Sequence, residues 1–581
     1  MPDAQLEIKV MTGVPISMRD GTILRADVYR PEAPGKYPVV LERTPYDRSE
    51  RRGNHIVLPV ELAKRGYAVV IQDVRGRHDS DGEFSPFHQE KTDGYDTLDW
   101  CTEQEWSNGK IGMFGGSYVG ATQWLASLTK HPSLSCIVPS VTSDDYYEGW
   151  TYQGGVLALG FVGSWSMFAL TLQNLQNLIR NNKTTKSDAQ VLISAIDSIP
   201  TSLQNHAPAY MEHLKPDFAP YYFDWINHPE NDAYWQSIRI SDHHEEINTP
   251  ALNIGGWFDI FISGTLRNFI GMTTKPSNME VRKSQRLIIG PWSHTTIASV
   301  SSGSQYFGLN ASHQGIDLLQ EHMDWYDYWL KDGADLLSSP VRIFVMGENV
   351  WRNEQTWPLA RTKYTEYFLH SSGSANTSTG DGELSRESAF DEMSDSYTFD
   401  PEDPVPTSGG GLCCYPSLLP GGPFDQSILE RRQDVLCYTS SQLTEDLEIT
   451  GHIELILFAS SSALDTDFTA KLVDVCESED CAIGLTDGII RAKYRNGTDK
   501  PDNLVSGQVY EFRIDLGATS NLFKKGHRIR LEVSSSNFPR FEINTNTGTT
   551  PAFSKVKNTA DQKIFHNTRY PSRLILPIIP R

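Results

Sequence analysis

The stretch from residue 110 to residue 120, K-I-G-M-F-G-G-S-Y-V-G, restricts the fold more than any other part of the sequence. A short apolar run ends in two glycines and Ser117, and a helix-like stretch follows from Tyr118. A strand, a very tight turn and a helix with a serine at the tip is the pattern of a nucleophile elbow. The turn strains the serine backbone, and neighbouring Cβ atoms would clash there, so glycines are needed. The helix N-terminus would then point backbone N–H groups at a developing oxyanion.

The third glycine of this motif is Gly120, one place later than in the common G-x-S-x-G form. A glycine turn that merely joins a strand to a helix is the alternative interpretation. Other parts of the sequence distinguish the nucleophile elbow from a simple glycine turn.

Short apolar runs alternate with helix-like segments over most of the first half of the chain. This alternation predicts a mostly parallel α/β sheet. Its two parts are expected at residues 1–144 and 242–335. The predicted strands lie at residues 23–29, 37–42, 67–72, 111–114, 137–141, 251–254 and 287–289.

Residues 145–241 interrupt this pattern, since they lack strand signals and are rich in Trp, Tyr, Asn and Gln. Within them Phe168, Leu172, Leu175 and Ile179 fall on one helical face. We expect a helical cap over the serine. An insertion that only packs against the edge of the sheet is the alternative.

The sequence changes character after a plausible linker at residues 333–340. Short β-type runs recur from Val341 onward without helices between them, which predicts an all-β domain at residues 340–581, a sandwich or jelly roll. The polar, acidic stretch at residues 371–406 is expected to be a long exposed loop.

Composition excludes several functions. The formal charge of −22 disfavours nucleic acid as a partner, and no apolar run approaches the ~20 residues of a membrane span. The N-terminal segment shows no signal-peptide pattern. Seven scattered cysteines favour a reducing, cytoplasmic location. We expect free thiols at the neighbouring Cys413 and Cys414, no metal site and no cofactor.

Three residues of the right types follow three of the predicted strands. Ser117, Asp259 and His294 occur in the order serine, acid, histidine that an α/β-hydrolase uses. A serine hydroxyl needs a base, which an imidazole supplies, and a carboxylate fixes the imidazole's tautomer. The alternatives are a helix N-cap for Asp259 and a surface position for His294.

An oxyanion hole needs two hydrogen-bond donors. The backbone N–H of Tyr118, directly after the serine, is expected to be one. The second usually lies in the loop after an early strand, here R-T-P-Y-D, where Tyr46 offers a side-chain donor.

Several longer motifs resemble the cocaine esterase and X-Pro dipeptidyl peptidase family of serine hydrolases. They are D-G-T-I-L-R-A-D-V-Y-R-P (residues 20–31), R-T-P-Y (43–46), Q-D-V-R-G-R (72–77), D-G-E-F (81–84), Q-E-W-S-N-G-K-I-G-M-F-G-G-S-Y-V-G (104–120), V-M-G-E-N-V-W-R (345–352) and G-H-R-I-R-L-E-V-S-S-S-N-F-P-R-F (526–541). The resemblance spans almost the whole chain. It implies an α/β-hydrolase domain, a helical cap and a C-terminal jelly roll, and the same triad and oxyanion hole.

The resemblance also implies an aromatic acyl pocket, with Trp150, Trp165 and Phe261 at the matching positions, although these could be ordinary core aromatics. The branch that hydrolyses α-amino acid esters has Glu where this chain has Val119, which disfavours an amino-ester substrate. A peptidase would need an anionic site for a free N-terminus. Asp144, Asp145 and Glu148 could form one, but a solvated acidic turn is the favoured interpretation.

The sequence therefore predicts a serine hydrolase, as a possible homodimer, that cleaves a small-molecule ester with an apolar or aromatic acyl group. An acyltransferase or lactone- or amide-forming enzyme on the same scaffold, and an X-Pro dipeptidyl peptidase, remain alternatives. A non-catalytic carbohydrate-binding protein is the alternative from a different class.

Overall fold

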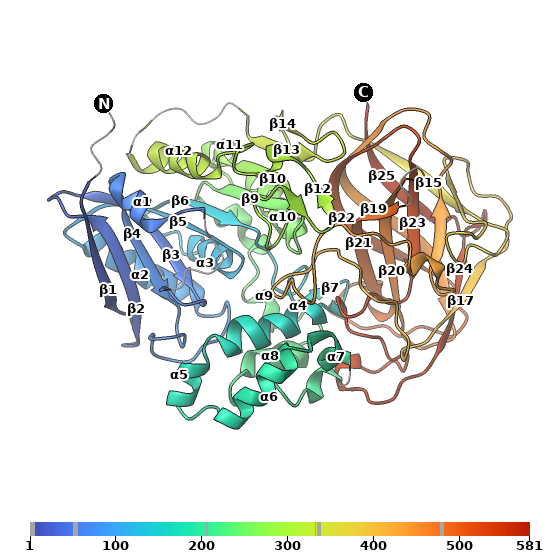
Figure 1. Cartoon of the computed structure of the whole chain (residues 1–581), viewed down its shortest axis with the longest axis horizontal. Coiled ribbons are helices and arrows are strands. Elements are labelled where there is room, and N and C mark those ends of the chain that lie inside the picture. Colours follow the sequence, from blue (N-terminus) through green and yellow to red (C-terminus); the bar gives the residue numbers. More distant parts are fainter. Residues whose placement is uncertain are drawn as a thin grey trace.

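A ten-stranded sheet forms the centre of the first half of the chain (Figure 1). The computed structural model describes residues 6–49, 56–204, 207–331, 333, 339–476 and 481–580. In spatial order the strands are β1 (Ile8–Ser17), β2 (Ile23–Pro31), β4 (Ala68–Asp73), β3 (Tyr37–Thr44), β5 (Ser107–Gly116), β6 (Leu134–Ser140), β9 (Leu252–Phe258), β10 (Arg286–Ser293), β13 (Val341–Val345) and β14 (Val350–Glu354). The run from β4 to β13 is parallel, as expected for an α/β fold.

Alternate residues of the central strands face two different helical layers. On β3, Val39 and Leu41 pack in the apolar cluster that contains residues of α2 (Glu90–Glu103) and α3 (Tyr118–Ser127). Val40 between them packs with α1 (Pro59–Lys64) and α12 (Leu318–Lys331). Because both faces are covered, these strands are apolar throughout rather than alternating. α10 (Ile262–Thr274) and α11 (Met279–Ser284) complete the helices of this domain.

The inserted residues form the helical layer at the bottom of Figure 1, beneath the first sheet. A short β7–β8 hairpin, which the sequence did not predict, leads into this layer. Its elements are β7 (Tyr152–Gln153), β8 (Val156–Leu157), α4 (Leu159–Ser164), the π-helix η1 (Trp165–Leu172), α5 (Leu175–Arg180), α6 (Lys186–Ile196), α7 (Ile199–Gln204), α8 (Pro220–Asn227) and α9 (Ala233–Gln236).

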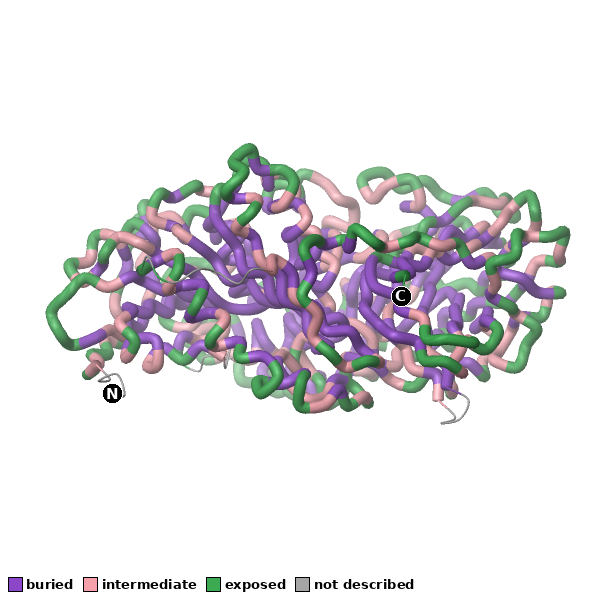
Figure 2. Tube along the Cα trace, turned by 90° about the horizontal axis from the view of Figure 1, so that it is seen from above, coloured by how far each residue is buried: buried purple, intermediate pink, exposed green. Residues whose placement is uncertain are grey.

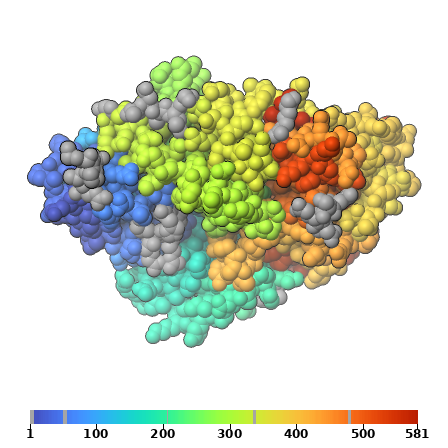
Figure 3. Space-filling model, turned by 45° about the horizontal axis from the view of Figure 1, so that its top comes forward, coloured from blue at the N-terminus to red at the C-terminus, as the bar shows by residue number. Residues whose placement is uncertain are grey.

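The C-terminal half is all-β and lies beside the first sheet and the cap (Figures 1 and 3). Its strands are β15 (Lys363–His370), β16 (Glu383–Ser385), β17 (Asp395–Phe399), β18 (Leu436–Thr439), β19 (Leu447–Ser461), β20 (Asp467–Cys476), β21 (Cys481–Arg491), β22 (Tyr510–Phe523), β23 (Arg528–Ser534), β24 (Ala560–Phe565) and β25 (Arg573–Ile579). Figure 2 shows the buried residues concentrated in the interior of both halves and the exposed ones in the outer turns.

Two predictions about the second half need correction. Val341 pairs with Leu287 of β10, so β13 and β14 extend the first sheet instead of opening the β domain. The stretch 371–406 is not simply an exposed loop, because it contains β16 and β17 and the fully buried Asp395. Most of the predicted linker, residues 334–338, lies outside the described residues.

None of the helices in the described ranges combines the length and the apolar character that crossing a membrane requires.

Candidate active site

Ser117 sits at the tip of the turn between β5 and α3, as the sequence predicts. Its φ of 60° is in the left-handed region that non-glycine residues seldom adopt. The turn is as crowded as the motif implies. A Cβ on Gly115 would lie 2.2 Å from a side-chain carbon of Val119, and one on Gly120 would lie 2.8 Å from Thr142. The late third glycine is therefore required by packing, because it lets α3 approach the strand beside it.

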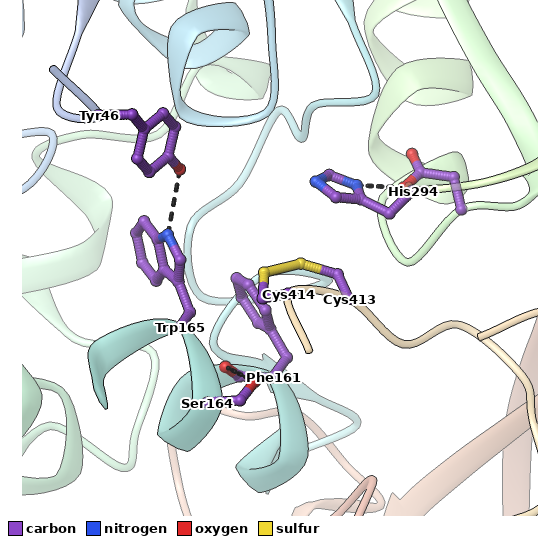
Figure 4. Close-up of a disulfide and its surroundings, with 8 residues drawn as sticks. Tyr46, Phe161, Ser164, Trp165, His294, Cys413 and Cys414 are labelled. Carbon is purple, nitrogen blue, oxygen red and sulfur yellow. Dashed lines mark hydrogen bonds and ion pairs between the residues drawn. A yellow bond between two sulfur atoms is a disulfide. The ribbon is translucent and has the colours of Figure 1, made fainter. Parts of the chain in front are cut away.

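Asp259 and His294 meet at the same edge of the sheet. They directly follow the neighbouring strands β9 and β10, and His294 Nδ1 lies 2.7 Å from Asp259 Oδ1. The carboxylate is buried, and the edge of the Phe261 ring contacts the imidazole with centroids 5.1 Å apart. Figure 4 shows the other nitrogen of His294 directed toward the side on which Tyr46 and Trp165 lie. Asp259 thus holds the imidazole in one orientation.

Ser117 belongs to the same edge, because β5 and β9 both flank β6 in the parallel sheet. Within the part of the chain that the structure describes, however, Ser117 and His294 do not form a hydrogen bond with one another. The hydroxyl of Ser117 lies close enough to Tyr46 to oppose the rise that burial causes in the pKa of that phenol. The structure therefore joins the acid to the histidine and places the serine near the tyrosine, on one edge of the sheet.

Tyr46 lies in the loop after β3, where the second oxyanion donor was expected. Its hydroxyl accepts a hydrogen bond from Trp165 Nε1 of the cap over 3.1 Å (Figure 4). Burial raises the pKa of Tyr46 to about 12, while the hydrogen bonds with Trp165 and Ser117 oppose that rise. The phenol therefore keeps its proton at neutral pH and remains a hydrogen-bond donor.

Tyr118 is the first residue of α3, so its backbone N–H has no acceptor within the helix. Its side chain is anchored elsewhere. The hydroxyl donates to Glu90 Oε1 over 2.8 Å, and Glu90 forms a buried ion pair with Arg43 at 2.6 Å. This network fixes the first turn of α3, and sequence reasoning did not identify it because its members lie in three separate elements.

The three predicted pocket aromatics lie together. The ring of Trp150 stacks on that of Phe261 with centroids 4.0 Å apart, and it meets Trp165 edge-on at 5.6 Å. Phe161 of α4, which the sequence analysis did not select, stacks on Trp165. All four side chains are buried. The aromatic cluster connects the Tyr46 side of the site to His294.

The acidic residues at the start of the cap are not a solvated turn, contrary to the favoured interpretation. Asp144 is fully buried and bonds to Arg267 at 2.7 Å, and Asp145 is paired with Arg239 at 2.8 Å. Burial raises the pKa of Glu148 to about 7, although the charge of Arg267 opposes the rise. Arginines on distant segments thus neutralise both aspartates, which spacing in the sequence does not reveal.

Cys413 and Cys414 are also not free thiols. They form a disulfide with each other, and Figure 4 shows its sulfur atoms among Tyr46, Phe161, Trp165 and His294. This loop of the β domain was missed because it is distant in sequence from every predicted site residue. The adjacent cysteines were the one signal that could have selected it.

Comparisons with known proteins agree with this architecture. Residues 20–296 match the model of the X-Pro dipeptidyl-peptidase (S15 family), and residues 336–575 match that of the X-Pro dipeptidyl-peptidase C-terminal non-catalytic domain. Cocaine esterase from Rhodococcus sp. (strain MB1 Bresler) is 40% identical over 98% of this chain and 99% of its own length.

Two solved structures are similar over the whole chain. An α-amino acid ester hydrolase has a TM-score of 0.80 at 25% identity, covering 100% of this chain and 98% of its own. An aminopeptidase from a marine sediment Thaumarchaeota archaeon shares the fold, with a TM-score of 0.82 at 24% identity, covering 100% of this chain and 99% of its own. The chain belongs to the cocaine esterase and X-Pro dipeptidyl peptidase family of α/β serine hydrolases.

Proposed function

We propose that this enzyme hydrolyses carboxylic esters with an apolar or aromatic acyl group through an acyl-enzyme on Ser117. The observation that carries the proposal is the 2.7 Å contact between His294 and the buried carboxylate of Asp259, on the sheet edge where the strained Ser117 lies. The 40% identity to cocaine esterase supports an ester as the substrate.

In the first step His294 Nε2 takes the proton of Ser117 while the serine oxygen attacks the ester carbonyl. The positive imidazole that results is stabilised by Asp259. The alcohol then leaves with the proton held by His294, and water repeats the sequence to release the acid. The hydrogen bond between a nucleophile and its base is often long without substrate and shortens in the complex. The missing Ser117–His294 bond is therefore compatible with this mechanism.

The negative oxygen of the tetrahedral intermediate would be held by two donors. The hydroxyl of Tyr46 keeps its proton, and Trp165 occupies one of its acceptor positions, so the phenolic hydrogen is available. The backbone N–H of Tyr118 is the second donor. Trp150, Trp165 and Phe261 would enclose the acyl group, and their apolar surface disfavours a charged one.

An X-Pro dipeptidyl peptidase is the second candidate, because both matched family models carry that description. The geometry of the candidate site gives the peptidase function less support than the esterase function. The aspartates that could hold a free N-terminus, Asp144 and Asp145, are already paired with Arg267 and Arg239. A panel of aryl esters run beside X-Pro p-nitroanilides separates the two functions, and faster turnover of the anilides would favour the peptidase.

Replacement of Ser117 by alanine tests the mechanism. We expect Ser117→Ala to lose both ester turnover and covalent labelling by an organophosphonate, because no other nucleophile is placed at the turn. Ser198→Ala, an exposed position in the cap, is the matched control and should keep both. Full activity of Ser117→Ala would rule the mechanism out. Adding alcohols or amines and analysing the products shows whether water is the preferred acyl acceptor.

A further inference from the structure

The disulfide between Cys413 and Cys414 occupies a central position in the candidate site (Figure 4). Cys413 is buried in the same apolar cluster as Phe161, Trp165 and Phe261, and the half-buried Cys414 packs against that cluster. Next to the disulfide, Tyr415 contacts Phe168 of the π-helix edge-on, with centroids 5.4 Å apart. The β domain thus contributes a sulfur-containing wall to a site otherwise made by the hydrolase domain and the cap.

The loop that carries the disulfide is fixed at its base. Gly410 and Gly422 exchange backbone hydrogen bonds of 2.8 and 2.9 Å, which closes the loop. Gly411 lies against the residue after the catalytic acid, since a Cβ added there would be 3.2 Å from Cα of Ile260. Any rearrangement of Cys413 and Cys414 is therefore confined to the part of the loop between Gly411 and Gly422, beside the aromatic cluster.

A disulfide between neighbouring residues closes a small ring that contains their peptide bond. Cys414 has a φ of 81°, in the left-handed region where non-glycine residues are uncommon. Reduction by a dithiol or a phosphine breaks the S–S bond, adds two electrons and two protons, and leaves two thiols, while the dithiol becomes a disulfide or the phosphine takes up oxygen from water. The two side chains are then free to rotate, and Cys414 can leave its left-handed conformation.

We propose that the Cys413–Cys414 disulfide is a redox-sensitive wall of the acyl pocket, whose oxidised form fits large aromatic acyl groups. The proposal rests on the ester-hydrolase function proposed above. Reduction loosens the wall and lowers the turnover of esters with a bulky acyl group, and it affects a small acyl group much less because that group does not reach the wall.

The position of Cys413 and Cys414 favours selective reduction of their disulfide. Among the other cysteines, Cys101, Cys136, Cys437 and Cys476 are buried and Cys481 is half-buried, and burial raises the pKa of the first three thiols. Thiols with a raised pKa are unreactive. Cys414 is half-buried whereas Cys413 is buried, so Cys414 is the side from which a small reductant would reach the disulfide in the folded enzyme.

The test compares the air-oxidised enzyme with enzyme treated with a trialkylphosphine and desalted under nitrogen. A phosphine is chosen because an added thiol could itself accept the acyl group. Peptide mapping locates the disulfide in the oxidised sample, and intact mass reports the two hydrogens that reduction adds. Phenyl acetate and phenyl benzoate share a leaving group, so their kcat/KM values differ only through the acyl group.

We expect reduction to lower kcat/KM for phenyl benzoate roughly tenfold, the order of effect of a small change in pocket shape, and to change phenyl acetate much less. Reoxidation should restore the benzoate value. The Cys413→Ser/Cys414→Ser variant should behave like the reduced enzyme and not respond to phosphine, whereas Cys437→Ala should respond as the natural enzyme does. If the double variant does not fold, the cycle of reduction and reoxidation on the natural enzyme decides.

Two results would overturn the inference. One is unchanged kcat/KM for both esters in enzyme whose mass shows complete reduction. The other is an oxidised sample in which peptide mapping finds no Cys413–Cys414 bond. Failure of the underlying function looks different, because the oxidised enzyme would then hydrolyse neither ester and an organophosphonate would not label Ser117, which overturns both proposals.

Discussion

The indole N–H of Trp165 donates a hydrogen bond to the hydroxyl of Tyr46 over 3.1 Å, and this bond joins the cap to the hydrolase domain at the candidate oxyanion hole. Because the indole occupies an acceptor position of the phenol, the hydroxyl proton can be directed at the substrate oxygen. In the proposed mechanism the cap would therefore both enclose the acyl group and orient the Tyr46 donor. On this proposal, the aromatic cluster of the cap and the sheet edge have to be assembled together for Tyr46 to be oriented.

Tyr46→Phe removes the proposed donor and keeps the ring. We expect kcat to fall by roughly 10² to 10³, the usual effect of losing one oxyanion donor, with little change in KM. Tyr222→Phe is the matched control, since it deletes another buried hydroxyl, one in the cap that bonds to Pro208. Steady-state kinetics on one aryl ester measure both variants. An unchanged kcat in Tyr46→Phe would assign the oxyanion to other donors.

Asp259→Asn tests the role of the carboxylate behind His294. An amide at this position favours the wrong imidazole tautomer and leaves the positive form unstabilised, so kcat should fall by about 10⁴. The exposed Asp197→Asn in the cap serves as the control and should be unaffected. Thermal unfolding of both variants shows whether the fold is intact. A loss smaller than about tenfold would mean that Asp259 does not orient the base.

Arg77 is a buried guanidinium that donates hydrogen bonds to three backbone carbonyls at this site. It donates to Pro45 O over 2.8 Å, directly before Tyr46, and to Leu170 and Ala169 of the π-helix that begins with Trp165. Arg77→Met removes these hydrogen bonds, although Pro45 O keeps its 3.0 Å contact with His78 Nε2, and a buried acceptor left unsatisfied costs about 1–3 kcal/mol. We expect a lower Tm together with a lower kcat on every ester, because both partners of the Tyr46–Trp165 bond lose their support.

The exposed Arg180→Met provides the comparison for Arg77→Met. A purely structural role of Arg77 would not change kcat relative to KM, so both constants are measured. If Arg77 positions Tyr46, kcat falls while KM is unchanged. A variant with reduced Tm but unchanged kcat would limit Arg77 to stability.

Much of the geometry of the candidate site could be predicted because local sequence determines it. The elbow glycines are needed wherever a strand turns sharply into a helix, and Asp259 and His294 could be placed at one edge of the sheet since each directly follows an apolar run. Parallel strands end at one edge, so residues in equivalent loops are neighbours. These are properties of short segments, and they do not depend on distant parts of the chain.

What could not be predicted depends on contacts between distant segments. Asp144 meets Arg267 across 123 positions, so the sequence alone suggested a solvated turn. Val341 has the apolar β-branched character of either sheet, and only its register with Leu287 assigns it to the first. The disulfide loop reaches the site from another domain, and adjacent cysteines do not by themselves indicate whether they are paired.

The β domain contains a buried charge cluster that should make its stability depend on pH. His566 Nε2 lies 3.0 Å from Asp395 Oδ2, and its Nδ1 lies 3.0 Å from Glu392. Burial lowers the pKa of His566, but the hydrogen bonds with the two carboxylates outweigh it and raise the pKa above its usual value. Tyr438 and Ser371 also bond to Asp395, and the pKa of that carboxylate is lowered although burial opposes this.

Because the folded pKa of His566 is raised, its stabilising effect is complete below the unfolded value of about 6.5 and is lost as the pH rises through the folded value. The lowered pKa of Asp395 acts in the opposite direction, since its contribution is present above about pH 4 and is lost as the pH falls further. We therefore expect the Tm of the β domain to decrease on both sides of this window. His566→Gln should lower Tm within the window and flatten its decline on the alkaline side, whereas the exposed His313→Gln should leave the calorimetric profile unchanged. An alkaline decline of equal slope in His566→Gln would show that the imidazolium does not contribute, because the folded state would then gain nothing from keeping that proton.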